Sequence, residues 1–190
     1  MPTVQRLNPD NQFNCSSITK ELVMIEIIDP NDSRAVRNKD NVLAWCELMI
    51  NQKRPKEAVA KYLNPNYIQH NPLIADGPDG LAAYFETLTT ERKYARLVVD
   101  KIMASGDWVW THGRFFNFIN DNPKDTGIAV VDIYRMDEDG KAIEHWDVLQ
   151  LIGDPKTNAA PFSNPTPKLI PMMIPRMRWK VRALNPNGVV

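Results

Sequence analysis

The fold is indicated most directly by the stretch IAVVDIYRMDEDGKAIEHWDVLQL, residues 128–151. Apolar residues alternate with polar ones over 128–136 and again over 142–151. The residues between them, Asp137-Glu138-Asp139-Gly140, are of the kinds that form tight turns. Two alternating runs joined by such a turn are typical of an antiparallel β-hairpin.

The register of this hairpin decides which side chains share a face. With a four-residue loop over 137–140, Asp132 lies opposite His145. Asp147 is two residues further along and points the same way. The sequence therefore predicts one sheet face that carries all three groups, whereas a three-residue loop would put Glu144 and Trp146 there instead.

The segments before the hairpin predict the rest of the domain. Residues 97–104 and 108–118 alternate like strands. A helical period begins at Ser33, which we take as an N-cap, and two further helices are predicted over 55–63 and 81–88. Helices followed by antiparallel strands indicate an α+β fold with the helices on one sheet face. The apolar stripe of the first helix consists of Val42, Trp45, Cys46 and Met49.

The two ends differ in composition from the middle. Residues 1–33 form a polar extension with one apolar run at 22–28, and we expect the domain to span 34–152. The tail, 153–190, is Pro-rich, and Met177, Trp179 and Val181 in it alternate with basic residues. This alternation predicts a strand that packs on the domain or on a dimer partner.

Composition excludes several classes of protein. Lys plus Arg equals Asp plus Glu at 23 each, so no net charge favours nucleic acid or an anionic membrane. No apolar run approaches the roughly 20 residues that span a bilayer. Cys15 and Cys46 form no CxxC pair. We therefore expect a cytoplasmic protein without nucleic-acid or membrane partners.

The predicted polar face is the first candidate site. Burying ionisable groups on the apolar side of a sheet destabilises the fold unless the groups are paired. Asp132 and His145 could satisfy each other in the core, but together with Asp147 they favour a pocket. The three histidines match no zinc-binding spacing such as HExxH, so we expect no metal and no cofactor.

A second group lies on the strand 108–118. Trp110 and His112 share a face of that strand, together with Trp108 and Arg114. An aromatic, an imidazole and a guanidinium side by side suit a ligand-binding wall. Sheet packing by the tryptophans explains the same pattern equally well.

Several motifs resemble the SnoaL-like polyketide cyclase family of the nuclear transport factor two-like superfamily. The resemblance runs from about residue 34 to 152. It is carried by Tyr67–Pro72, Gly77–Gly80 with Tyr84-Phe85, Val131–Arg135, Asp139–Lys141 and Glu144–Asp147. The turn at 137–140 looks one residue longer than is usual in the family.

The resemblance implies a cone-shaped barrel, in which a strongly curved antiparallel sheet wraps around N-terminal helices, and often a dimer. It implies that Asp147 is the acid/base of a cofactor-free aldol-type cyclisation, and that Asp132 and His145 match polar positions of the same site. It also makes His70 and Tyr134 candidates for substrate binding.

Two functions follow as hypotheses. The first is a lyase- or isomerase-type enzyme that performs aldol cyclisation, isomerisation or dehydration on a hydrophobic, polyketide-like carbonyl metabolite. In it, His70, Tyr134, Trp110 and His112 contact the substrate. The second is a non-catalytic ligand-binding or dimerisation module on the same fold. In both we expect a homodimer.

Overall fold

Four long antiparallel strands form the centre of the structure, a computed structural model that describes residues 24–152. They are β3 (Arg96–Ser105), β4 (Trp108–Phe116), β5 (Ile128–Met136) and β6 (Ala142–Leu151), and each pairs with the next. The predicted bounds of β5 and β6 are confirmed. β4 ends two residues earlier than predicted because Asn117 leaves the strand with a φ of 56°. Cys15 and the alternating run in the tail lie outside the described residues.

The two edge strands pair in parallel. β1 (Ile25–Ile28) lies along β3, and β2 (Leu63–Gln69) lies along β6, giving the order β1-β3-β4-β5-β6-β2. The predicted α+β class is therefore confirmed. The four strands that the sequence predicts pair antiparallel as expected, and the parallel pairs involve only β1 and β2, which were not predicted as strands. The edges do not pair with each other, so the sheet is open and does not close into a barrel.

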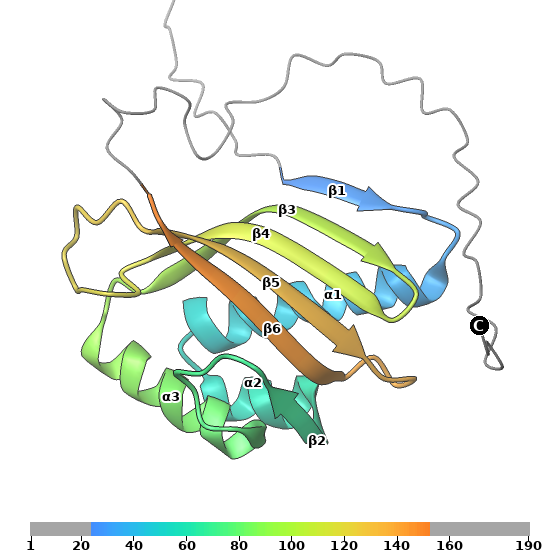
Figure 1. Cartoon of the computed structure of the whole chain (residues 1–190), viewed down its shortest axis with the longest axis horizontal. Helices are drawn as coiled ribbons and strands as arrows, with labels where there is room; N and C mark the ends of the chain where they lie inside the picture. Colours follow the sequence, from blue (N-terminus) through green and yellow to red (C-terminus); the bar gives the residue numbers. More distant parts are fainter. Residues whose placement is uncertain (1–23, 153–190) are drawn as a thin grey trace, which may run out of the picture.

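The helices cover one face of this sheet (Figure 1). They are α1 (Ser33–Cys46), the π-helix η1 (Glu47–Asn51), α2 (Pro55–Tyr62) and α3 (Gly77–Glu91). The N-cap of α1 is Asp32, whose carboxylate accepts from the Ala35 N–H, and not Ser33 as predicted. All four residues of the predicted apolar stripe on the first helix are buried. No helix in residues 24–152 combines the length and the apolar character needed to cross a bilayer.

The β5–β6 hairpin has a different register from the predicted one. Asp132 lies opposite Asp147, and Tyr134 lies opposite His145. Met136 pairs with Ala142 although Arg135 pairs with Glu144, so one residue is inserted in β6 as a β-bulge. The turn is one residue longer than assumed and the bulge adds another, so the partner of Asp132 shifts by two residues and the alternation of faces is kept. Asp132, His145 and Asp147 consequently still share the face that the helices cover.

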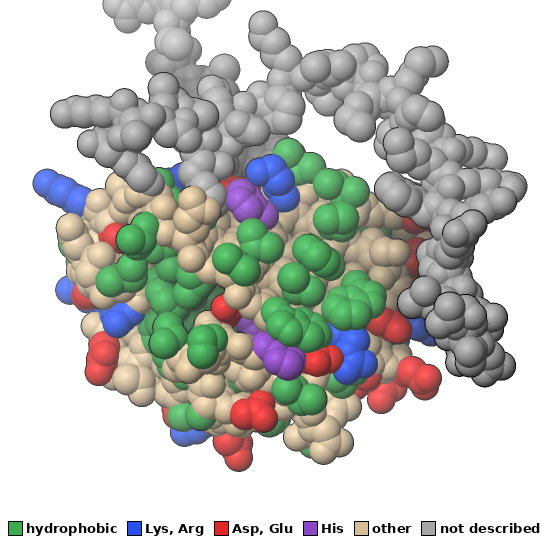
Figure 2. All heavy atoms as spheres, viewed as in Figure 1, with side chains coloured by type: hydrophobic (Ala, Val, Ile, Leu, Met, Phe, Trp, Pro, Cys, Tyr) green, Lys and Arg blue, Asp and Glu red, His purple; other side chains and the backbone are tan. Residues whose placement is uncertain are grey.

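The opposite face of the sheet carries large apolar side chains that the described helices leave uncovered. Met103, Trp108, Trp110 and Val148 are 44, 42, 43 and 66% exposed. Figure 2 shows hydrophobic side chains gathered over the strands on this face. We call it the outer face.

Candidate active site

A narrow cavity lies between the sheet and the helices. Its volume is about 50 Å³ for the centres of water molecules, which is room for several waters. Most of its wall is apolar and comes from the helices and strands together. The apolar lining includes Ile50, Leu81, Phe85, Phe115, Phe118 and Leu149, and the lining residues with polar groups include Trp45, Asn71, Asp132, Tyr134, His145 and Asp147.

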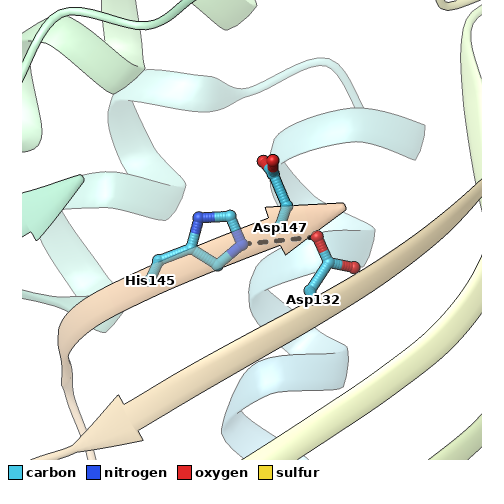
Figure 3. Close-up of side chains that lie close together, drawn as sticks. All are labelled: Asp132, His145 and Asp147. Atoms are coloured by element: carbon cyan, nitrogen blue, oxygen red, sulfur yellow. Dashed lines mark hydrogen bonds and ion pairs between the residues drawn. The ribbon is translucent and has the colours of Figure 1, made fainter. Parts of the chain in front are cut away.

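Asp132, His145 and Asp147 form a cluster at one side of this cavity. One ligand atom from each lies within 4.8 Å of the other two. His145 Nε2 is 3.3 Å from Asp132 Oδ1, and both residues are buried. Figure 3 shows the imidazole of His145 directed at Asp132, while the carboxylate of Asp147 is turned away from this pair. The two aspartates therefore have different hydrogen-bond partners.

The hydrogen bonds around His145 determine where its protons are. The Asn71 N–H donates to Gln69 Oε1 at 2.9 Å, which fixes that atom as the carbonyl oxygen of the amide. His145 Nδ1 lies 3.1 Å from the same oxygen and must donate to it. Nε2 then faces a carboxylate oxygen of Asp132, so one further proton lies between these two atoms. His145 and Asp132 are a pair that shares a proton.

Asp132 is held from its other side by β4. The Thr111 hydroxyl donates to Asp132 Oδ2 at 2.8 Å, in the buried interior. Asp132 thus accepts from Thr111 and shares the proton with His145, which satisfies both carboxylate oxygens. A carboxylate engaged in this way is a poor candidate for direct attack on a substrate.

Asp147 is the half-buried carboxylate that borders the cavity. Both its oxygens accept from Asn71 Nδ2, at 2.9 and 2.8 Å. Burial raises the pKa of Asp147 above its usual 3.8, and the hydrogen bond from Asn71 opposes this shift. The charge of His145 also lowers the pKa, and that of Asp132 raises it. Asp147 is therefore a stronger base than an exposed aspartate, and it lies next to apolar space.

Tyr134 packs on the other side of His145. Their rings stack with centroids 4.8 Å apart, and the Tyr134 hydroxyl is 3.7 Å from Cys46 Sγ. Burial raises the pKa of Tyr134 well above its usual value and that of Cys46 to about 12. Cys46 therefore remains a thiol and is no nucleophile, in agreement with its predicted place on the apolar stripe.

The structure does not bring three of the predicted substrate-binding residues to the cavity. Trp110 and His112 alternate with the inward-facing Thr111 and lie on the outer face. His70 stacks on Trp146 with centroids 4.6 Å apart. It also bonds Glu144 at 2.9 Å, which lowers the pKa of that carboxyl. These residues therefore form a surface that is separate from the cavity.

Sequence reasoning missed the residues that orient the cluster. Gln69 and Asn71 lie within the motif 67–72, in which the sequence analysis singled out His70 alone. Thr111 lies between Trp110 and His112, so the same strand alternation that put those two on one face puts Thr111 on the other. Alternation could have found Thr111, but nothing in the local sequence distinguishes Gln69.

The cluster has the donor types of a divalent metal site. One imidazole and two carboxylates within 4.8 Å could surround a single cation. However, both ring nitrogens of His145 are already engaged, one by Gln69 and the other by Asp132. A metal ion would have to displace one of these protein contacts. The arrangement fits proton transfer better than metal binding.

Comparisons with known proteins identify the family and the fold. The profile of the SnoaL-like domain family matches residues 34–145. A candidate polyketide cyclase from Bacillus cereus superposes with a TM-score of 0.56 at 19% identity, over 66% of this chain and 83% of that chain. An NTF2-like protein of unknown function from Mesorhizobium loti gives 0.53 at 13%, over 65 and 98%. At such identities these structures show the fold alone, and no curated protein matches the chain.

Proposed function

This chain belongs to the SnoaL-like domain family, and on that premise we propose that it is an enzyme of the lyase or isomerase type. In this proposal it applies acid–base catalysis to a carbonyl compound with an apolar body. The observation that carries the proposal is Asp147, a half-buried carboxylate of raised pKa that borders an apolar cavity. Perturbed carboxylates in such clefts are typical of catalytic bases.

The proposed reaction begins with removal of a proton from the carbon next to the substrate carbonyl. Asp147 accepts this proton, and Asn71 holds its carboxylate in place. Aldol closure, isomerisation and dehydration of carbonyl compounds can all begin with this step. The proposal is therefore made for the shared step, for which a well-placed base contributes a factor of about 10²–10⁴.

The Asp132–His145 pair adjusts the strength of this base. Its negative member raises the pKa of Asp147, and its positive member lowers it. The charges of the pair therefore influence the basicity of Asp147. In this role the pair acts on the substrate through Asp147.

The apolar wall supports a substrate with an apolar body. Phe85, Phe115 and Phe118 line the cavity together, and Phe115 contacts each of the other two rings. Removing apolar surface from water contributes about 25 cal/mol per Å². A flat or slender hydrophobic group suits this narrow space.

The proposal can be tested without knowledge of the natural substrate. Acetophenone in D₂O exchanges its methyl protons when a base removes them, and ¹H NMR follows the loss of signal. We expect the wild type to catalyse this exchange about 10²–10⁴ times faster than Asp147→Asn. Asp139→Asn, at an exposed position in the hairpin turn, is the matched control and should behave as wild type. Equal exchange rates for wild type and Asp147→Asn would show that Asp147 is not the catalytic base.

The outer face supports a second proposal, that two copies of the chain associate through it. Exposed apolar patches of this kind commonly mark interaction sites. Trp110→Glu, at the 43% exposed tryptophan of β4, should convert a dimer to a monomer in sedimentation equilibrium. Ile119→Glu, at a 57% exposed position in the loop after β4, should leave the mass unchanged. A wild type that sediments as a monomer would contradict this proposal and leave the catalytic one intact.

A further inference from the structure

The indole nitrogen of Trp45 is a buried donor without an acceptor. Trp45 lies on α1 and is 2% exposed, and its Nε1 has no hydrogen-bond partner within the described part of the chain. An unpaired buried donor destabilises a fold, and for this reason nearly all such groups in proteins are paired. This one therefore needs an explanation.

The packing around Trp45 holds its ring in place. The rings of Tyr67, Tyr134 and His145 contact it edge-on, with centroids at 6.2, 5.2 and 6.3 Å. Trp45 is the last residue but one of α1, and the π-helix η1 begins two residues later; π-helical turns are frequent at functional sites. With three rings against it, the indole cannot turn its N–H to solvent without disrupting the core.

The residue that carries the unpaired donor is part of the lining of the candidate active site. Trp45 borders the same cavity as Asp147 and the proton-sharing pair. Two nitrogen donors of that wall already have acceptors, since Asn71 Nδ2 donates to Asp147 and His145 Nδ1 donates to Gln69. Among the described residues that line this cavity, Trp45 Nε1 is the buried side-chain nitrogen that still lacks an acceptor.

We infer that Trp45 Nε1–H donates a hydrogen bond to a neutral oxygen of the bound compound. The oxygen is neutral because the carboxylates of Asp132 and Asp147 line the same cavity and repel an anion. A ketone, aldehyde or ester oxygen meets this condition. Trp45 thereby orients the carbonyl toward the base.

This inference rests on the proposed function and extends it. When Asp147 removes the proton, negative charge develops on the carbonyl oxygen. A donor that is fixed in advance, in a site with little water, stabilises that charge more than it stabilises the neutral substrate. His70 and His112, which were expected from sequence to contact the substrate, do not line the cavity, so Trp45 takes the role of holding the carbonyl.

Binding of two probes of the same shape tests the hydrogen bond. Acetophenone has a carbonyl oxygen where α-methylstyrene has a CH₂ group. In wild-type protein labelled with ¹⁵N, the indole N–H resonance of Trp45 should move downfield with acetophenone and much less with α-methylstyrene. Trp45→Phe assigns this resonance by its disappearance. If the Trp45 resonance does not move with acetophenone, or moves equally with both probes, the inference is wrong.

Affinities provide a second measurement. For each protein, the dissociation constant of α-methylstyrene is divided by that of acetophenone. The wild-type ratio divided by the Trp45→Phe ratio isolates the contribution of the N–H. We expect about tenfold in favour of acetophenone, the effect of one neutral hydrogen bond. Trp110→Phe, on the outer face, should keep the wild-type ratio. A quotient near one would overturn the inference, and the NMR experiment decides alone if Trp45→Phe does not fold.

The inference and the proposed function fail in different ways. If Asp147→Asn exchanges the protons of acetophenone as fast as wild type while the Trp45 resonance still moves, the base assignment is wrong and the Trp45 contact stands. If exchange depends on Asp147 but the Trp45 resonance is unchanged, the base stands and Trp45 does not contact the oxygen.

Discussion

Replacing Gln69 by leucine should destabilise the domain far more than the loss of a single polar side chain suggests. Gln69 Oε1 accepts from two buried donors, the Asn71 N–H at 2.9 Å and His145 Nδ1 at 3.1 Å. Leucine has nearly the same size and leaves both donors without an acceptor. It also removes the Nε2 that donates to the Tyr67 hydroxyl at 3.0 Å.

The expected loss follows from counting these donors. Each buried donor left unpaired costs about 1–3 kcal/mol, so the free energy of unfolding should fall by about 2–6 kcal/mol. For a domain of this size, 1 kcal/mol corresponds to roughly 3–5 °C in Tm. The melting temperature of Gln69→Leu should therefore lie at least about 6 °C below that of wild type.

Thermal unfolding followed by circular dichroism, with urea titrations for the free energy, measures this loss. Gln150→Leu is the matched control, because Gln150 is an exposed glutamine on β6. It should stay within about 0.5 kcal/mol of wild type. The ¹⁵N shifts of the His145 ring give a second readout, since the proton on Nδ1 is no longer held there once Gln69 is replaced.

The refuting result is equally specific. If Gln69→Leu unfolds like Gln150→Leu, the carbonyl of Gln69 does not satisfy two buried donors. If the protein is destabilised but the His145 ring nitrogens keep their wild-type shifts, Gln69 supports the fold without determining the proton positions of the candidate site.

Asp147→Asn should leave the free energy of unfolding at pH 7 unchanged or higher, because burial disfavours the charge at this position; a clear loss in urea titrations would contradict this. In wild type the exchange of acetophenone protons should rise with pH through the folded-state pKa of Asp147, since the ionised form is the base, and a limb at or below 3.8 would contradict the raised value. The stability that protonated Asp147 contributes is fully present below 3.8 and is lost as pH rises through the raised pKa, so pH-dependent melts of wild type against Asp147→Asn should show that sign. EDTA should change neither the rate of proton exchange nor the Tm, because protein groups occupy both His145 nitrogens. Loss of exchange activity in EDTA that a divalent cation restores would show that the site needs a metal ion.

Much of the fold could be predicted because its signals are local. The alternation over 128–136 and 142–151 gave the bounds of β5 and β6, and the period of the first helix gave its buried stripe. The family resemblance is confirmed by the match over residues 34–145. These features depend on neighbours within a few positions, where periodicity is a reliable guide.

The features that were missed depend on distant partners. β2 contains Pro65 between two asparagines, residues that usually end strands, and it forms only because β6 offers an edge for parallel pairing. The bulge in β6 depends on where β5 pairs, so the register of Asp132 could not be read from loop length. The same limit applies to Trp45, whose place on the apolar stripe gave no sign that its nitrogen lacks a partner.

The position of Gln69 has a consequence for how the candidate site is maintained. It is the last residue of β2, an edge strand whose pairing with β6 is interrupted between Leu63 and Ile68. Edge segments with incomplete ladders open more readily than the centre of a sheet. We expect transient fraying at this margin to free the His145 ring while the hydrophobic core stays intact, so the geometry of the candidate site can be lost without global unfolding.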